Sequence, residues 1–185
     1  HTLILCGDSS QAGPIDGKGQ ITWQGTSGVN ECGIWNFAAI RTVATTHYSA
    51  ASFDFKAPQP RLAEVPTQNQ QGKLPGMEIY EYAGAYGYKN QSDGQDFVRL
   101  RMEEIEAAAK YFDASGDDDH VQCGRSFILA GHLGLKDIGS EEGDNEFLIT
   151  EVKHTASNNY ETQQGGSAEY LSVFTCLRKK IPWRP

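Results

Sequence analysis

Only one stretch of this sequence has the repeat of an amphipathic helix, and this limits the chain to a mostly β fold. The apolar stripe of that stretch consists of Val98, Met102, Ile105, Ala109 and Phe112. Their spacing places them on one helical face, so we predict a helix over 94–112. Ser92 and Gln95 fit a capping box at its start. Glu106 and Lys110 are placed for a surface ion pair one turn apart.

The rest of the chain reads as short strands joined by turns. Runs rich in β-branched, aromatic and aliphatic residues predict strands at 3–5, 34–48, 53–55, 77–82, 127–132, 147–154 and 170–177. Pro58 and Pro60 end one run because proline cannot donate to a central ladder. Segments rich in Gly, Asp and Asn at 134–145 and 155–168 predict hairpin-like loops. Together these patterns predict a mainly β (β-rich α+β) fold, an antiparallel barrel or sandwich with one helix.

Charge and hydropathy exclude several classes of partner. The formal net charge is −8, which argues against nucleic acid or an anionic membrane as the main partner because both attract basic patches. No apolar run approaches the roughly 18 residues that span a bilayer, so we predict no membrane anchor. The chain begins with His1 and lacks a signal-peptide layout, which suggests an excised fragment without a signal peptide.

Four cysteines are spread widely along the chain. They are Cys6, Cys32, Cys123 and Cys176. No CxxC pair occurs, whereas zinc sites usually show closely spaced ligand pairs. We predict a reduced, partly buried set, and disulfides remain an alternative if the protein acts outside the cell.

Ser9 lies in the segment Cys6–Pro14, which has a superficial similarity to the nucleophile loop of trypsin-like proteases. Such a serine needs a histidine base and an oxyanion hole. The loop stands at the start of this chain, and Ser10 replaces the glycine that follows the serine in those proteases. A turn after a strand is therefore favoured over a catalytic serine.

The acidic segment from Asp113 to Asp119 has the composition of a cation loop. An EF-hand that began at Asp113 would need Gly at its sixth position and Glu at its twelfth, where this chain has Asp118 and Gly124. We therefore predict a solvated acidic turn, with a weak surface calcium site as the alternative.

The remaining candidate side chains form no recognised catalytic or metal-binding spacing. The histidines without HExxH or HxxxH spacing are His47, His120, His132 and His154. The adjacent carboxylates are Glu103 with Glu104 and Glu141 with Glu142, and neighbours on a helix do not face each other. No glycine-rich phosphate loop occurs. We predict no catalytic, cofactor-binding or metal-ligating residue, no cofactor and no enzyme activity.

Six segments of the chain, in this order, carry a further signal: Ser52–Pro58, Glu78–Tyr86, Val98–Glu104, Gly124–His132, Phe147–Ser157, and a closing pair made of Phe174–Cys176 and Ile181–Pro185. In sequence and order they resemble segments of the VgrG family and of related phage late-control (gene D-type) tail-hub proteins. The similarity covers about 35–185, and the first 34 residues match least well. The departures are Ala83 and Cys123, where the family usually has proline, and Leu133 after the histidine.

The resemblance implies a structural component of the spike or tail hub of a contractile injection machine such as a type VI secretion system. Such a hub is usually a homotrimer that adapts to a hexameric tube protein and delivers effectors with a tip protein. It is assembled in the bacterial cytoplasm and injected into the target cell. The family's amino-terminal barrel, OB-fold and needle are absent from this sequence. A phage baseplate hub and a small secreted hydrolase using Ser9 are the alternatives.

The resemblance also suggests a discontinuous division of the chain. We expect 35–66 and 118–180 to form a tube-type β-barrel. We expect 1–34 and 67–117, including the helix, to form an accessory lobe. Residues 181–185 would begin a linker to the absent OB-fold.

Overall fold

The protein consists of two compact units that are each described separately. A computed structural model describes residues 6–17, 19–24, 32–70, 72–132, 144–158 and 168–185. Unit 1 comprises His1–Ile40 and Tyr111–Pro182, and unit 2 comprises Arg41–Lys110 and Trp183–Pro185. The expected strand at 3–5, Glu141, Glu142 and Leu133 lie outside the described residues.

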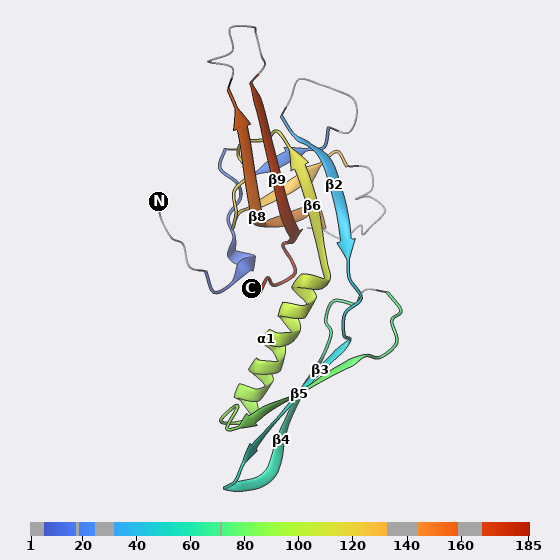
Figure 1. Ribbon diagram of the computed structural model, residues 1–185, viewed down its shortest axis with the longest axis vertical. Coiled ribbons are helices and arrows are strands. Elements are labelled where there is room, and N and C mark those ends of the chain that lie inside the picture. Colours follow the sequence, from blue (N-terminus) through green and yellow to red (C-terminus); the bar gives the residue numbers. More distant parts are fainter. Residues whose placement is uncertain (1–5, 18, 25–31, 71, 133–143, 159–167) are drawn as a thin grey trace. The chain divides into compact units, whose positions relative to one another are not determined.

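Unit 1 contains a curled six-stranded sheet (Figure 1). Its strands are β1 (Gln20–Thr22), β2 (Ile34–Arg41), β6 (Lys110–Gly116), β7 (Ser126–Ala130), β8 (Glu146–Ser157) and β9 (Glu169–Arg178). The order across the sheet is β1-β7-β8-β9-β6-β2. Pairs β7–β8, β8–β9 and β6–β9 are antiparallel, as predicted, whereas the short β1 pairs with β7 in parallel. The mainly β fold is thereby confirmed.

The two edges of this sheet meet at one end. An isolated bridge joins Trp23, just after β1, to Ile34 at the start of β2, and Gln24 N donates to Ile34 O at 2.8 Å. The curl encloses an apolar core whose fully buried members are Ile15, Ile21, Ile34, Phe112, Ala114, Val121, Phe127, Leu129, Phe147, Ile149, Phe174 and Cys176. Much of the core is aromatic: the Phe147 ring lies 5.0 to 5.6 Å from the rings of Phe37, Phe112 and Phe127.

β8 and β9 form the longest ladder of the described residues, from Phe147 opposite Arg178 to Ser157 opposite Glu169. Both strands were predicted and both extend beyond the predicted limits. β8 is buried at its beginning and exposed toward its end, as its change from apolar to polar residues indicates. A bulge between Ile149 and Glu151 accompanies this change.

The helix ends earlier than predicted because a strand follows it directly. α1 spans Gln91–Ala109, and Phe112 belongs to β6 rather than to the helical stripe. From Tyr111 onward alternate residues are buried in β6, and Phe112 and Ala114 face the core of unit 1. The spacing from Ala109 to Phe112 continued the helical repeat by coincidence, so the prediction missed a strand.

Unit 2 is a three-stranded sheet covered on one face by α1. Its strands are β3 (His47–Asp54), β4 (Ala57–Pro66) and β5 (Glu78–Ala85), in the order β4-β3-β5. β3 pairs with β4 in antiparallel and with β5 in parallel. Pro58 and Pro60 lie inside β4 rather than ending a strand, and β4 is an edge strand, where proline is tolerated.

The core of unit 2 lies between the sheet and α1. Val98 and Met102 of the helix pack against Tyr48, Ala50 and Ala63 of the sheet. The true N-cap is Asn90, whose side chain accepts a hydrogen bond from Asp93 N at 2.9 Å, so the capping box at Ser92 was wrong. No helix in the described part of the chain is long and apolar enough to cross a membrane.

The division of the chain differs from the expected one. Of 35–66, only β2 belongs to the six-stranded sheet, because β3 and β4 pair with β5 in the other sheet. β1 and β6, which were expected in the accessory lobe, are strands of the six-stranded sheet. Unit 2 thus interrupts unit 1 in sequence, and near its two ends Thr42 N donates to Ala109 O at 2.8 Å.

Candidate functional site

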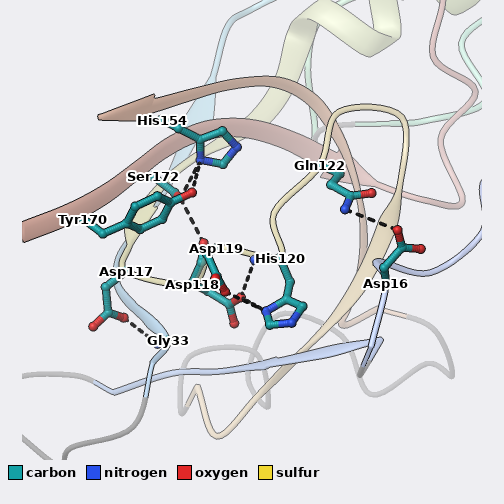
Figure 2. Close-up of polar contacts among 10 residues, drawn as sticks. All are labelled: Asp16, Gly33, Asp117, Asp118, Asp119, His120, Gln122, His154, Tyr170 and Ser172. Carbon is teal, nitrogen blue, oxygen red and sulfur yellow. Dashed lines mark hydrogen bonds and ion pairs between the residues drawn. The ribbon is translucent and has the colours of Figure 1, made fainter. Parts of the chain in front are cut away.

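The acidic turn after β6 is the group of polar side chains in unit 1 that most resembles a ligand site (Figure 2). Asp113 is not part of it: this residue lies within β6, and its Oδ1 accepts a hydrogen bond from Thr175 Oγ1 at 3.1 Å. Asp117 anchors the beginning of the turn. Its Oδ1 accepts from Gly33 N at 2.8 Å, and its own N–H donates to Gly33 O at 3.1 Å.

Asp118 is buried, at 1% exposure, so the turn is not simply solvated. Its Oδ1 accepts from His120 N at 3.0 Å and lies 3.2 Å from His120 Nδ1. The same ring nitrogen is 2.9 Å from Asp119 Oδ1. One potential ligand atom from each of Asp118, Asp119 and His120 lies within 4.8 Å of the others. Within the turn, Asp118 Oδ1 and Asp119 Oδ1 both contact His120 Nδ1.

A serine and a histidine meet beside this turn, but not as a catalytic pair. Ser172 Oγ lies 2.9 Å from His154 Nδ1, and Tyr170 Oη lies 2.7 Å from the same nitrogen (Figure 2). Ser172 is fully buried, and its hydroxyl donates to the backbone oxygen of Asp118 at 2.9 Å. Its proton is therefore directed away from His154, whereas a nucleophilic serine must give its proton to the histidine.

No sequence pattern pointed directly to Ser172. Its relation to His154 follows from strand register, since the two residues are directly opposite each other on β9 and β8. Tyr170, two residues earlier on β9, stacks on the His154 ring at 5.7 Å. Cross-strand alternation on two correctly predicted strands could have found this contact once the register was known.

The other candidate residues are held separately. Ser9 begins the 3₁₀ turn Ser9–Gln11, which is capped by Asp8 through a 2.9 Å bond from Ser10 N. His47, at the start of β3, lies 3.9 Å from Glu64 Oε2. Glu103 and Glu104 face different arginines: Glu103 bonds Arg99 and Arg184, and Glu104 bonds Arg101.

The cysteines differ in exposure. Cys6, Cys32 and Cys123 are exposed, and Cys176 lies in the core of unit 1. Burial, with a smaller contribution from Asp113, raises the pKa of the Cys176 thiol well above its ordinary value. A thiol in that environment is an inert apolar group rather than a nucleophile.

Unit 2 contains a cavity of about 430 Å³ beside a buried carboxylate. Glu106 is expected from its spacing to pair with Lys110, but it is buried and its Oε1 accepts three hydrogen bonds. The donors are Thr67 Oγ1 at 2.5 Å, Gln68 N at 2.8 Å and Asn69 N at 3.1 Å. The carboxylate therefore fastens the segment after β4 to α1, which is a structural role.

His132 lies close to two aromatic rings of unit 1. Its ring lies 4.5 Å from the Trp23 ring and 5.8 Å from the Phe37 ring, and its Nδ1 is buried with no hydrogen-bond partner among the described residues. Burial lowers its pKa below the ordinary value of 6.5.

We expect the free energy of unfolding to fall as the pH drops through about 6.5. At that pH His132 becomes protonated in the unfolded chain, whereas its lowered pKa keeps it neutral in the folded protein. Stability from this source is complete above the unfolded pKa and is lost below it. Urea titrations at several pH values between neutral and mildly acidic measure the free energy of unfolding of wild type and of His132→Phe. The effect of His132 is the difference between the two proteins in the slope of this free energy against pH. Equal slopes against pH would contradict this role of His132.

Comparison with solved structures shows which proteins share this fold. The chain is similar to the 43 kDa tail protein of prophage MuSo2 from Shewanella oneidensis, with a TM-score of 0.55 and 10% identity over 89% of this chain and 47% of that one. It is also similar to the tail protein from Neisseria meningitidis MC58, with a TM-score of 0.57 and 8% identity over 88% and 44% of the two chains. These likenesses show the fold of phage tail proteins.

Sequence comparison identifies the family. Residues 1–160 match the phage tail baseplate hub (GPD) family, and the chain belongs to that family. It is 24% identical over 194 residues to the type VI secretion system spike protein VgrG3 of Vibrio cholerae. It is 25% identical over 153 residues to the spike protein VgrG1b of Pseudomonas aeruginosa. The matches cover 100% and 82% of this chain but 18% and 19% of those relatives. The resemblance predicted from the six segments is confirmed.

Proposed function

We propose that this chain is a structural part of the spike hub of a contractile injection machine of the type VI secretion kind. The family match over residues 1–160, together with two relatives that are both spike proteins, carries the proposal. The curled sheet of unit 1 would be the tube-type barrel. Its long β8–β9 ladder suits a role in transmitting force through hydrogen-bonded strands rather than in making or breaking bonds.

In this proposal the full-length protein is a homotrimer that adapts to a hexameric tube protein and carries effectors or a tip protein. It assembles in the bacterial cytoplasm and leaves the cell with the tube. The buried, hydrogen-bonded state of Ser172 and the burial of Cys176 support a role without enzyme activity. A phage baseplate hub is the second candidate, because the matching family is described by that role.

Deletion of the gene tests the proposal directly. We expect the deletion strain to stop releasing the tube protein into the medium, and a plasmid copy of the full-length gene to restore release. Undiminished release would overturn the secretion role. Loss of infectious phage particles together with normal tube release would favour the phage baseplate candidate instead. Native mass of the full-length protein, expected to equal three copies, tests the trimer separately.

A further inference from the structure

The cavity in unit 2 has a volume of about 430 Å³, within the roughly 300–1,000 Å³ of pockets that hold small ligands. The last turn of α1 forms one wall through Ile105, Glu106 and Ala109. Residues 44–46, just before β3, and residues of the segment after β4 form the others. All of these residues belong to unit 2, so one compact unit builds the whole cavity.

Glu106 brings a buried carboxylate to the wall of this cavity, at 7% exposure. Its Oε1 already accepts the three hydrogen bonds from the segment after β4. No described residue donates a hydrogen bond to its Oε2. The wall is also the C-terminal end of a helix with no basic residue in its last turn, where the backbone carries partial negative charge. Oε2 is therefore an acceptor suited to a donor that enters the cavity.

Asn69 supplies the opposite group, a donor without an acceptor. Its side chain lines the cavity, and its Nδ2 is buried with no hydrogen-bond partner among the described residues. Native proteins leave few buried polar groups unpaired, because each costs stability. Asn69 N donates to Glu106 Oε1 at 3.1 Å, so the unpaired donor and the available acceptor belong to two residues in direct contact.

A donor beside an acceptor is the complement of an amide, which has one N–H group and one carbonyl oxygen. Leu74 and Ile105 add apolar lining for a side chain next to that amide. A free amino acid fits less well, because its carboxylate would approach the buried carboxylate of Glu106. Lys73, the lining residue that could neutralise such a carboxylate, is exposed to solvent. These groups favour a neutral peptide over a charged small molecule.

We propose that this cavity binds a short peptide segment of another protein. A peptide N–H of that segment donates to Glu106 Oε2, and a peptide carbonyl accepts from Asn69 Nδ2. An adjacent apolar side chain packs against Leu74 and Ile105. This binding site goes beyond the proposed hub function and does not depend on it.

NMR titration of the ¹⁵N-labelled 185-residue chain with N-acetyl-leucine methylamide tests the proposal. This probe carries peptide groups on both sides of one apolar side chain. We expect shifts in the signals of Gln68, Asn69 and the last turn of α1. Two ester analogues each replace one peptide N–H by oxygen. One of them should bind about tenfold more weakly, the value of one hydrogen bond to a carboxylate.

Glu106→Gln identifies the acceptor of that hydrogen bond. Glutamine keeps an oxygen for the three donors after β4 and presents an N–H group in place of the free acceptor. We expect the amide probe and its two esters to bind this variant with equal affinity. A difference between amide and ester as large as in wild type would assign the hydrogen bond to another residue and overturn the site.

Asn69→Leu separates a binding role from a structural one. Leucine removes the unpaired donor, so we expect the variant to unfold at a higher urea concentration than wild type. The same variant should bind the amide probe about tenfold more weakly. Asn36→Leu, which replaces an exposed asparagine of unit 1, is the control and should change neither quantity. A less stable Asn69→Leu with unchanged binding would show that the side chain only supports the fold.

The wild-type titrations decide the proposal even if Glu106→Gln fails to fold. No saturable shift with the amide probe, or equal binding of the amide and both esters, would overturn it. Tighter binding of free leucine than of the capped probe would identify an amino-acid site and also overturn it. The secretion assay on the deletion strain gives its result independently of these outcomes.

Discussion

Phe147→Ala is expected to lower the free energy of unfolding of unit 1 by about 3–5 kcal/mol, the usual cost of removing a buried phenylalanine ring. Phe147 is fully buried, and its ring contacts those of Phe37, Phe112 and Phe127. These rings come from three other strands or strand ends, so the cavity left by alanine cannot be closed by one local shift. A loss of that size consumes a large part of the roughly 5–15 kcal/mol that stabilises a typical domain.

Chemical denaturation followed by tryptophan fluorescence measures the effect, with Val173→Ala as the control. Val173 lies on β9 and is 45% exposed, so its truncation removes fewer buried contacts. We expect a cost below about 1 kcal/mol for the control, as for most exposed positions. Similar midpoints for Phe147→Ala and Val173→Ala would show that the aromatic cluster is not the centre of the core.

Asp144→Ala is expected to cost about 3–5 kcal/mol, because it leaves a buried guanidinium without its counter-ion. Arg178 Nη1 donates to Asp144 Oδ1 at 2.9 Å, and the side chains are 6% and 8% exposed. Lys180 Nζ lies 2.6 Å from the same oxygen. Arg178 Nε and Nη2 are buried without a hydrogen-bond partner among the described residues, so the aspartate carries most of the compensation for the buried charge.

The double variant Asp144→Leu with Arg178→Met distinguishes the cost of leaving one buried charge unpaired from the cost of losing the ion pair itself. Replacing both members of a buried ion pair by apolar residues is often neutral or stabilising, so the double variant should be more stable than Asp144→Ala. Glu104→Ala is the control, since its partner Arg101 and Glu104 itself are both about half exposed and such pairs contribute below about 1 kcal/mol. A cost for Asp144→Ala no greater than that of Glu104→Ala would contradict the importance of this pair.

The strands with long, regular patterns could be predicted from the sequence, and the grouping of strands into sheets could not. β8 and β9 were predicted because their apolar residues and flanking Gly- and Asn-rich segments agree with each other. β6 was missed because Phe112 continued the helical spacing, and a single residue cannot decide between a period of 3.6 and a period of 2. The separation of β3 from β2 depends on pairing with β5, about thirty residues later, which no local pattern encodes.

The candidate site was predictable in composition but not in its contacts. The acidic turn was identified from the sequence, but the burial of Asp118 was not. Asp118 is buried because it lies against β9, where the Ser172 hydroxyl donates a hydrogen bond to the Asp118 backbone oxygen. Glu106 was assigned to a surface pair because spacing on α1 alone places it near Lys110. The three donors at 67–69 come from a segment distant in sequence, so only the tertiary structure reveals that this carboxylate is a buried anchor.

The hydrogen bond between Thr42 and Ala109 joins the two ends of the continuous segment of unit 2, Arg41–Lys110. A segment whose ends are adjacent can be shortened, enlarged or exchanged while the backbone separation between its two attachment points stays the same. The segment Arg41–Lys110 is therefore an insertion in the sequence of unit 1 whose length or composition can change while its two attachment points stay adjacent.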